Sequence, residues 1–458
     1  MPTRNRSDAV SVAQARRLAG LAAFPRVGAE SAKTGVGLEP ELFPIVSDAS
    51  GAPRERLVLS RPNGLGVVQV IDGIAGADGP ILPRIGRPPH AFFYPLTGGG
   101  RLTFEPGAQV EHSTTVHPSA AAALQDIEGT IGLLQSAFRP RSVRLAAVGL
   151  DVWHDVEEVP QQLRAGRYTA QAAYYRQRGH WGAVMMRHTA SLQINLDLGP
   201  EGVWQERWLA SNLISPFLTA TFACSPGSGV VCARARAWQE LDPTRSGFPG
   251  RLVTGAGDDP RTEWAEAALQ ADVMLIRASE EHFVPGCPGY RFVDWIENGH
   301  PRLGWPTVED LDYHLTTLFF EIRARGFLEL RAGEAVPDHV RPAQVVLASA
   351  VLYDEQARAE ALSLLADYRT ELPKLWSRAA AVGVHDDELR ELACRLWTIA
   401  LAGARRLPKG WVGDGNLAAT EAFLEAYTAG GRVPADRLAE LLEDDPARAL
   451  AWASSEIV

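Results

Sequence analysis

Apolar and polar residues alternate without interruption along residues 190–198, whose sequence is ASLQINLDL. The apolar set is Ala190, Leu192, Ile194, Leu196 and Leu198, and the polar set is Ser191, Gln193, Asn195 and Asp197. Because successive side chains of a β-strand point to opposite faces, this period predicts a strand with one face in a hydrophobic core. An ordinary solvent face would carry Lys, Glu and Arg, whereas this one carries two amides, a hydroxyl and one carboxylate. The sequence therefore raises the question of what this polar face contacts.

Similar patterns predict further elements in the first three quarters of the chain. Helical periodicity covers residues 8–24, opening on Ser7 or Asp8, and then residues 118–138 and 203–223. Strand-like runs bounded by Gly and Pro are predicted at residues 64–76, 100–113, 143–153 and 326–334, and a turn that feeds a strand at residues 29–46. The mixture of strands and helices indicates an α+β domain.

The character of the chain changes after about residue 340. Residues 342–369, 386–407 and 435–457 are rich in Ala, Leu and Arg and have helical periodicity. This change could mark a domain boundary, or it could mark a helical layer that closes one α+β domain. We favour the second interpretation, with an α+β catalytic domain at residues 1–340 and a helix-rich C-terminal region at residues 341–458 packed on the same domain.

Composition narrows the class of protein. The 458 residues are 46% hydrophobic and 22% charged, which is the balance of a globular protein. The net charge of −10 comes without a basic stripe, which argues against a nucleic-acid partner, and no run approaches the ~18 apolar residues of a membrane span. The four cysteines fit no zinc or CxxC spacing, and the N-terminus has no signal-peptide pattern. We therefore expect a soluble, cytoplasmic protein.

In several predicted strands an acidic residue stands two positions from another polar or charged residue. The pairs are Glu39 with Glu41 in VGLEPELF, Gln109 with Glu111 in LTFEPGAQVEHS, where Glu105 precedes the Pro-Gly interruption, and Glu329 with Arg331 in FLELRAG. Residues i and i+2 of a strand point to the same face. If these strands lie side by side, at least five carboxylates face one space, together with Gln193 and Asn195.

Carboxylates held close together repel each other and take up protons unless cations neutralise them. Divalent ions with oxygen ligands are the natural partners, and Mg²⁺ usually arrives with substrate phosphates, which Arg331 would suit. The alternative is that each pair is a solvated face or a salt bridge, which is the commoner case for any single pair.

The sequence contains no P-loop, nucleophile elbow or HExxH motif, and His112 and His117 are expected to be surface or packing residues.

Five segments between about residue 35 and residue 335 resemble motifs of one enzyme family, in the family's order. MMRHTASLQINLDLG resembles the MM-x-x-T-A-S-x-Q-V-N-L-D motif of the plant and bacterial glutamate–cysteine ligases, LTFEPGAQVEHS their F-E-P-G-G-Q-x-E-L-S segment, and VGLEPELF their G-x-E-x-E strand. RARAWQELDPTRSGFP and DLDYHLTTLFFEIRARGFLELRAGE resemble two later blocks. The nearest likeness is to the actinobacterial branch that supplies γ-glutamylcysteine for ergothioneine synthesis. Ala108, His112 and Phe320 depart from the family pattern, but none of them replaces an expected catalytic group.

The resemblance implies a glutamine-synthetase-like fold, in which a curved antiparallel sheet surrounds an ATP and metal site with helices behind it. It implies an ATP-dependent ligase that joins the side-chain carboxylate of L-glutamate to the amine of L-cysteine through an acyl phosphate, with ATP and Mg²⁺ as cofactors. The implied catalytic residues are Glu39, Glu41, Glu105, Glu329 and Arg331. The implied metal ligands are Glu39, Glu41, Glu105, Glu111 and Glu329, and the implied cofactor contacts are Gln193, Asn195 and Arg331.

Arg245 in the loop WQELDPTRSGFPG, and more weakly Arg187, are implied to hold the α-carboxylate of glutamate, since a guanidinium binds a carboxylate through two parallel hydrogen bonds. The alternative for Arg245 is an ion pair with Asp242 that braces the loop. The amides of the alternating strand could likewise form a ladder across the sheet. Two other functions stay open: a ligase of the same fold with a different amine substrate, and a catalytically silent binding or regulatory member.

Overall fold

In the part of the chain that the structure describes, a ten-stranded antiparallel sheet carries the alternating strand. The computed structural model describes residues 5–26, 34–88, 90–200, 202–227, 229–255, 259–280 and 282–457. The strands of this sheet are β1 (Val36–Ser47), β2 (Pro53–Arg56), β3 (Ile85–Gly86), β4 (Phe92–Pro95), β5 (Arg101–Phe104), β6 (Val110–Ser113), β7 (Val143–Ala146), β8 (Leu192–Asp197), β13 (Ile322–Ala324) and β14 (Phe327–Leu330). Their order is β13-β14-β8-β1-β6-β5-β4-β3, and β2 and β7 pair with the second half of β1. The long strand β1 therefore joins every part of the sheet.

Two small sheets and many helices complete the described chain. The small sheets are β9 (Ser246–Gly247) with β12 (Phe319–Phe320), and β10 (Leu275–Arg277) with β11 (Phe283–Pro285). The α-helices are α1 (Val12–Ala23), α2 (Val67–Asp72), α3 (Ala120–Phe138), α4 (Gly166–Arg176), α5 (Trp181–His188), α6 (Val203–Thr221), α7 (Ala233–Leu241), α8 (Gly250–Thr254), α9 (Pro260–Gln270), α10 (Phe292–Asn298), α11 (Val308–Leu315), α12 (Arg341–Tyr353), α13 (Glu355–Leu365), α14 (Leu372–Val382), α15 (Asp387–Arg406), α16 (Asp414–Ala426), α17 (Pro434–Asp444) and α18 (Pro446–Ala453). Short 3-10 helices are η1 (Arg6–Asp8), η2 (Arg139–Arg141), η3 (Ala366–Glu371), η4 (Gly383–His385) and η5 (Thr428–Gly430).

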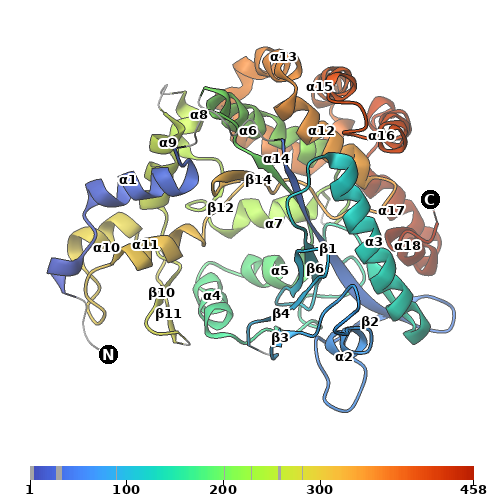
Figure 1. Ribbon diagram of the computed structural model, residues 1–458, viewed down its shortest axis with the longest axis horizontal. Helices are drawn as coiled ribbons and strands as arrows, with labels where there is room; N and C mark the ends of the chain where they lie inside the picture. The colour runs from blue at the N-terminus through green and yellow to red at the C-terminus, as the bar shows by residue number, and fades with distance from the viewer. Residues whose placement is uncertain are drawn as a thin grey trace.

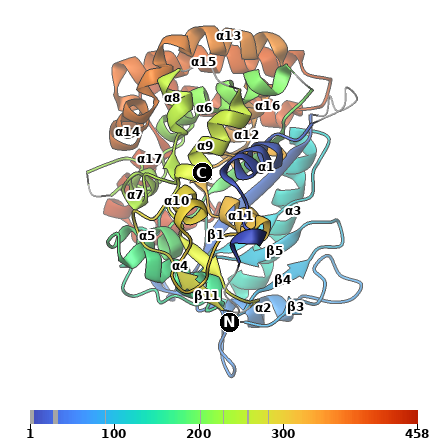
Figure 2. The same ribbon diagram turned by 90° about the vertical axis from the view of Figure 1, so that its left-hand side faces the viewer.

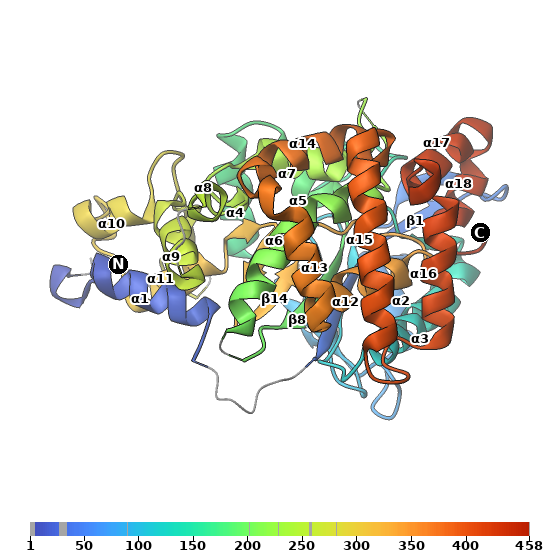
Figure 3. The same cartoon turned by 90° about the horizontal axis from the view of Figure 1, so that it is seen from above.

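Helices cover one face of the sheet in two layers. α3, α6 and α12 contact its strands directly, and α13, α14, α15 and α16 pack against α6 or α12 (Figures 1 and 2). At the opposite end of the molecule, α1, α9, α10 and α11 form a separate group, to the left in Figure 3. The β10–β11 hairpin packs against α11 of this group and against α4. None of the described helices combines the length and the apolar character that a membrane crossing requires.

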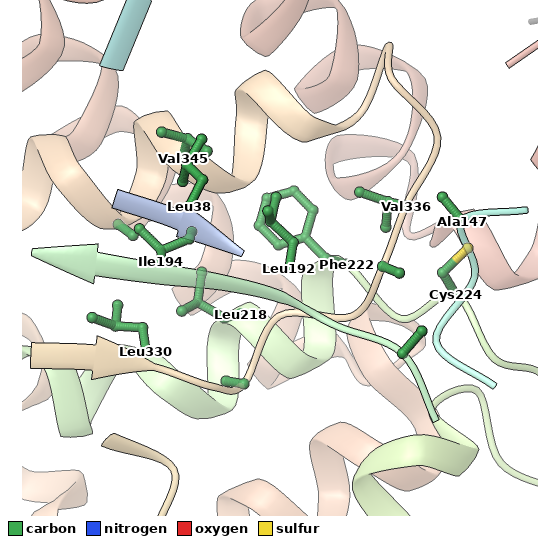
Figure 4. Close-up of a cluster of buried hydrophobic side chains, with 14 of the residues drawn as sticks. Leu38, Ala147, Leu192, Ile194, Leu218, Phe222, Cys224, Leu330, Val336 and Val345 are labelled. Carbon is green, nitrogen blue, oxygen red and sulfur yellow. The ribbon is translucent and has the colours of Figure 1, made fainter. Parts of the chain in front are cut away.

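The two faces of the sheet differ in polarity around β8. Leu38 of β1 and Leu330 of β14 stand opposite Ile194 in the two neighbouring strands, and all three side chains are buried. Figure 4 shows them in one hydrophobic cluster with Leu192 and with side chains of the helices behind the sheet, such as Val345. The apolar half of the alternating pattern therefore faces the helical layers, and its polar half faces the other side of the sheet.

Most of the predicted elements are confirmed. The strands at 143–153, 190–198 and 326–334 and the helices at 118–138 and 203–223 are present with shorter bounds, and the region after residue 340 is helical. The strand-like run at 100–113 forms two paired strands, β5 and β6, on either side of a turn. The predicted turn that begins at residue 29 falls partly on residues 27–33, which lie outside the described residues.

Two predicted elements are wrong in type or in start. Residues 64–76, predicted as a strand, contain the helix α2, because their buried valines and Ile71 lie at helical spacing. α1 begins after Ser11 rather than near Asp8, since the Ser11 side chain accepts a hydrogen bond from the Gln14 amide at 3.2 Å and caps the helix. From sequence alone, the short apolar run at residues 64–76 is compatible with either a strand or a helix. Likewise, more than one polar residue near the N-terminus could precede α1.

Candidate active site

One face of the sheet gathers acidic residues from segments that lie far apart in sequence. Backbone register places Glu39 of β1 opposite Gln193 of β8, and Glu41 of β1 opposite Glu111 of β6. On the other side of β8, β14 brings Glu329 to the same face. The strands of the sequence motifs are therefore neighbours, and their polar residues form one surface, as the spacing of two predicted.

Glu105 reaches the same space from the turn between β5 and β6. The turn is closed by hydrogen bonds from the Ala108 amide to the Glu105 carbonyl (2.9 Å) and from the Glu105 amide to the Gln109 carbonyl (3.0 Å). Gly107 is needed here because a Cβ at its position would lie 2.3 Å from the Arg187 carbonyl oxygen. Ala108 has a φ of 67°, a left-handed conformation that strains a residue with a side chain. The backbone thus holds Glu105 in place through a tight and partly strained turn.

Ser191, directly before β8, and the polar side chains of β8 hold the two acids of β1. Ser191 donates to both Glu41 oxygens at 2.9 Å, from its backbone N to Oε2 and from Oγ to Oε1. Gln193 Nε2 donates to Glu41 Oε1 at 3.2 Å, and Asn195 Nδ2 donates to Glu39 Oε1 at 2.8 Å. The amides therefore bind carboxylates of the neighbouring strand and do not form an amide-to-amide ladder. This answers the question of what the polar face contacts.

Burial and crowding raise the pKa values of three of these carboxyl groups. Burial raises the pKa of Glu41, although Arg234 and the hydrogen bonds from Ser191 oppose the change. Burial, reinforced by the charge of Glu41, raises the pKa of Glu105 to about 8. Burial, reinforced by Glu39 and Glu105, raises the pKa of Glu111 well above its ordinary value. A cation among these groups would lower their pKa values and stabilise their charged forms.

Glu329 differs because guanidinium groups already balance its charge. Arg323 Nη2 lies 2.7 Å from Glu329 Oε1 and Arg323 Nε lies 3.0 Å from Oε2, while Arg331 Nη1 lies 2.6 Å from Oε1. Burial alone would raise the pKa of Glu329, but Arg323 and Arg331 lower it to about 2. Its predicted role as a metal ligand stays a prediction, and its oxygens are engaged here in a buried ion-pair network. Arg331 is fixed further by Gln193 Oε1 at 2.7 Å.

Two adjoining cavities open on the acidic face. The outer cavity has a volume of about 1020 Å³, and its walls include the aromatic side chains Phe92, Phe93, Phe104 and Phe327. The inner cavity has a volume of about 180 Å³, and its lining includes Glu41, Gln193, Arg234, Trp238 and Arg331. The residues that line both cavities are Glu39, Glu105, Glu111, Arg167, Tyr168 and Arg323. Most of the acid cluster therefore lies where the two cavities meet.

The side chains present fit a hard divalent cation, although they do not form a closed ligand shell by themselves. Among the described residues, no group of three or more His, Cys, Asp or Glu side chains is arranged closely enough to hold a metal ion. The acids at the junction nevertheless offer only carboxylate oxygens, which Mg²⁺ prefers, and Mg²⁺ commonly completes its shell with water and substrate phosphates. Asn195 Oδ1 adds a buried oxygen that has no hydrogen-bond partner among the described residues. These observations fit a metal that binds together with its substrate.

Arg245, which is predicted to bind substrate, lies outside both cavities. Its side chain is fully buried, with Nε donating to Asp242 Oδ2 at 2.8 Å and Nη1 donating to the Thr317 carbonyl at 2.8 Å. Nη2 donates to the Asp272 carbonyl. The ion pair that braces the loop, the alternative for this residue, is the observed arrangement. Arg187 donates to main-chain carbonyls and also lies outside both cavities.

Several cavity residues were missed from sequence. Arg323 lies opposite Glu329 in the β13–β14 pair, and its spacing of two from Arg325 in FEIRARG was an available signal. Arg234 of α7 donates to the Arg331 carbonyl at 3.0 Å. α4 contributes three further side chains, Arg167, Tyr168 and Gln171. No spacing rule pointed to α4, because its segment lies between the motifs and approaches the sheet only in the folded chain.

Comparisons with known proteins show the family to which the sequence is similar. The family model described as glutamate-cysteine ligase family 2 (GCS2) matches residues 61–451. The chain is 36% identical to the glutamate–cysteine ligase EgtA of Mycolicibacterium smegmatis over 320 residues, which cover 68% of this chain and 72% of the relative. It is 33% identical over 357 residues to the EgtA of Mycobacterium tuberculosis, covering 74% and 79%.

A solved structure has a similar fold. It is a glutamate–cysteine ligase (gshA) from Francisella tularensis in complex with AMP, with a TM-score of 0.52 and 13% sequence identity over 93% of this chain and 89% of that one. At this identity the likeness concerns the fold. Together with the antiparallel sheet and its helical layers, it confirms the predicted fold class.

Proposed function

Since this chain belongs to glutamate-cysteine ligase family 2, we propose that it uses ATP to join the γ-carboxylate of L-glutamate to the amine of L-cysteine. The observation that carries the proposal is the cluster of Glu39, Glu105 and Glu111 at the junction of a large and a small cavity, with Glu41 beside them in the small one. The product would be γ-glutamylcysteine, which we assign to the synthesis of ergothioneine or a related thiol. We place the reaction in the cytoplasm, where thiols such as cysteine are kept reduced.

The dimensions of the cavities suggest how the substrates divide between them. The outer cavity, at about 1020 Å³, matches the upper end of the range of about 300–1,000 Å³ for ligand sites, and its aromatic walls suit a purine ring. Arg101 and Arg325 line the same cavity and suit phosphate oxygens. The inner cavity, at about 180 Å³, suits the reacting carboxylate and a small amine. We therefore place ATP in the outer cavity and the acceptor groups in the inner one.

The acids at the junction would hold Mg²⁺ between the two substrates. Bound there, Mg²⁺ would neutralise the charge on the phosphate oxygens and on the acceptor carboxylate, which otherwise repel each other. Glu39, Glu41, Glu105 and Glu111 would supply its protein ligands. Glu329 would fix Arg323 and Arg331 from behind, so that Arg331 is oriented before substrate arrives.

The proposed reaction has two steps. In the first, an oxygen of the glutamate γ-carboxylate bonds to the γ-phosphorus of ATP while the bond to the β–γ bridging oxygen breaks, which gives an acyl phosphate and ADP. In the second, the cysteine amine attacks the acyl carbon and the C–N bond forms. The acyl C–O bond breaks, phosphate leaves with the former carboxylate oxygen, and the proton lost by the amine is released to solvent. The protein contributes positioning and charge neutralisation in a largely buried site. No enzyme thiol or hydroxyl is required as a nucleophile.

Phosphate release in the presence of Mg²⁺, ATP, glutamate and a panel of amino acids tests the proposal. Cysteine should stimulate release far more than the other amines, and mass spectrometry should detect γ-glutamylcysteine. Stimulation by another amine alone would instead support a same-fold ligase with a different substrate. Glu39→Gln is the matched control, because it removes one charge from the acid cluster and should abolish release with every amine.

A further inference from the structure

The first turn of α4 reaches the junction between the two cavities. Arg167, the second residue of this helix, lines both the outer and the inner cavity, and so does Tyr168. Both stand in a segment that carries no family motif. α4 therefore brings the guanidinium of Arg167 to the point where the acid cluster of the sheet lies between the outer and inner cavities.

The charge of Arg167 is available to a ligand, unlike that of the other arginine at the junction. Arg323 is almost buried and donates to both oxygens of Glu329. Arg331, deeper in the inner cavity, is also committed to Glu329. Arg167 is exposed and forms no ion pair with any residue that the structure describes. Its guanidinium carbon lies 4.9 Å from the centre of the Tyr168 ring, which supports the side chain without neutralising it.

The position of Arg167 identifies the group that it can meet. With ATP in the outer cavity and glutamate in the inner one, the adenine stays on one side and the amino-acid carboxylates stay on the other. The transferred phosphoryl is the one group that passes from the outer space to the inner space. Its equatorial oxygens carry negative charge throughout, and a planar guanidinium binds two such oxygens through parallel hydrogen bonds.

We propose that Arg167 is a further catalytic residue, which binds the oxygens of the phosphoryl group as it moves from ATP to the glutamate γ-carboxylate. This inference rests on the proposed function. Arg167 donates hydrogen bonds and transfers no proton. The bond between the γ-phosphorus and the β–γ bridging oxygen breaks, the bond to the carboxylate oxygen forms, and ADP is the leaving group. Arg167 would act from the helix side, opposite the acids and Arg331 on the sheet side.

Arg167→Met and Arg167→Lys test the proposal, with Arg176→Met as the matched control. Arg176 is exposed in the last turn of the same helix and lines neither cavity, so its replacement makes the same change of charge away from the site. Removing one arginine that stabilises a transferring phosphoryl typically costs about 10³-fold or more in kcat. We expect Arg167→Met to lower kcat at least about 100-fold, with the KM for glutamate little changed. Arg167→Lys should recover only part of the loss, and Arg176→Met should match the wild type.

Guanidinium ion supplied to Arg167→Ala gives a second readout. Partial recovery of turnover at millimolar guanidinium, without recovery by sodium at the same ionic strength, would support direct contact with the phosphoryl group. A turnover of Arg167→Met within about threefold of the wild type would overturn the proposal. A raised KM for glutamate at unchanged kcat would overturn it too, since it would make Arg167 a carboxylate-binding residue. If the wild-type chain forms no γ-glutamylcysteine, the proposed function itself fails. If the wild type is active and Arg167→Met is equally active, only the role of Arg167 fails.

Discussion

Glu329→Gln removes the carboxylate that neutralises two buried guanidinium groups. The Glu329 side chain is 1% exposed, and Arg323 and Arg331 lower its pKa from the ordinary 4.5 to about 2. One pKa unit corresponds to about 1.4 kcal/mol, so these ion pairs contribute about 3 kcal/mol to the free energy of unfolding at neutral pH. Because the folded-state pKa lies below the unfolded one, this contribution is present above about pH 4.5 and is lost as the pH falls through about 2.

Urea unfolding followed by tryptophan fluorescence at about pH 7.5 measures this loss. The variant should be less stable by about 3 kcal/mol, in line with the cost of breaking a buried ion pair. Glu440→Gln is the control, because it breaks an ion pair with Arg432 in which both side chains are about half exposed, and it should cost less than about 1 kcal/mol. The folded fraction of Glu329→Gln should also turn over more slowly, since Arg331 loses its support. Equal stability of Glu329→Gln and the control would refute this account of Glu329.

Four further predictions concern the metal, the acids, the loop arginine and the thiols. Excess EDTA should abolish turnover, and added Mg²⁺ should restore it. Glu39→Gln should lower turnover about 100-fold or more in saturating Mg²⁺. Near-normal activity in EDTA or in the variant would contradict the metal assignment. Because the pKa of Glu105 is raised to about 8, Mg²⁺ binding measured by calorimetry should release protons and weaken as the pH is lowered from about 9 to about 6, and a pH-independent affinity would argue against ligation by these acids. Arg245→Lys should lower the melting temperature and leave the KM for glutamate unchanged in the folded fraction. A raised KM for glutamate at an unchanged melting temperature would instead support a role for Arg245 in substrate binding. Replacing all four cysteines with Ala or Ser should leave turnover in the folded protein, and a folded but inactive single-cysteine variant would overturn the proposed thiol-independent chemistry.

The sequence predicted the acidic face because that face depends on local periodicity. A spacing of two places Glu39 and Glu41 on one side of a strand wherever that strand lies in the fold, and the same holds for Gln193 and Asn195. The apolar half of the alternation, which includes Ile194, likewise specified the buried face. The pleat of a strand determines which residues share a face, and this does not depend on how the rest of the chain is arranged.

The roles of the arginines could not be predicted in this way. Arg245 and Arg167 both lie outside the strands, and their sequence surroundings do not say which of them is buried against Asp242 and which faces a cavity. Their environments depend on packing between segments that are far apart in sequence. The same limit applies to Glu329, whose pairing with Arg323 requires the β13–β14 register. The family motifs contain Arg245 and Glu329 without giving their partners, and they do not contain Arg167.

In the proposed mechanism, ATP phosphorylates the γ-carboxylate of glutamate at the acidic junction between the cavities before cysteine attacks. Glutamate labelled with ¹⁸O in its γ-carboxylate tests this most directly, in a reaction with ATP, Mg²⁺ and cysteine analysed by mass spectrometry of the inorganic phosphate. The mechanism predicts one ¹⁸O atom in phosphate for each γ-glutamylcysteine formed, with ADP as the other product. Formation of γ-glutamylcysteine with unlabelled phosphate, or with label in AMP, would contradict it.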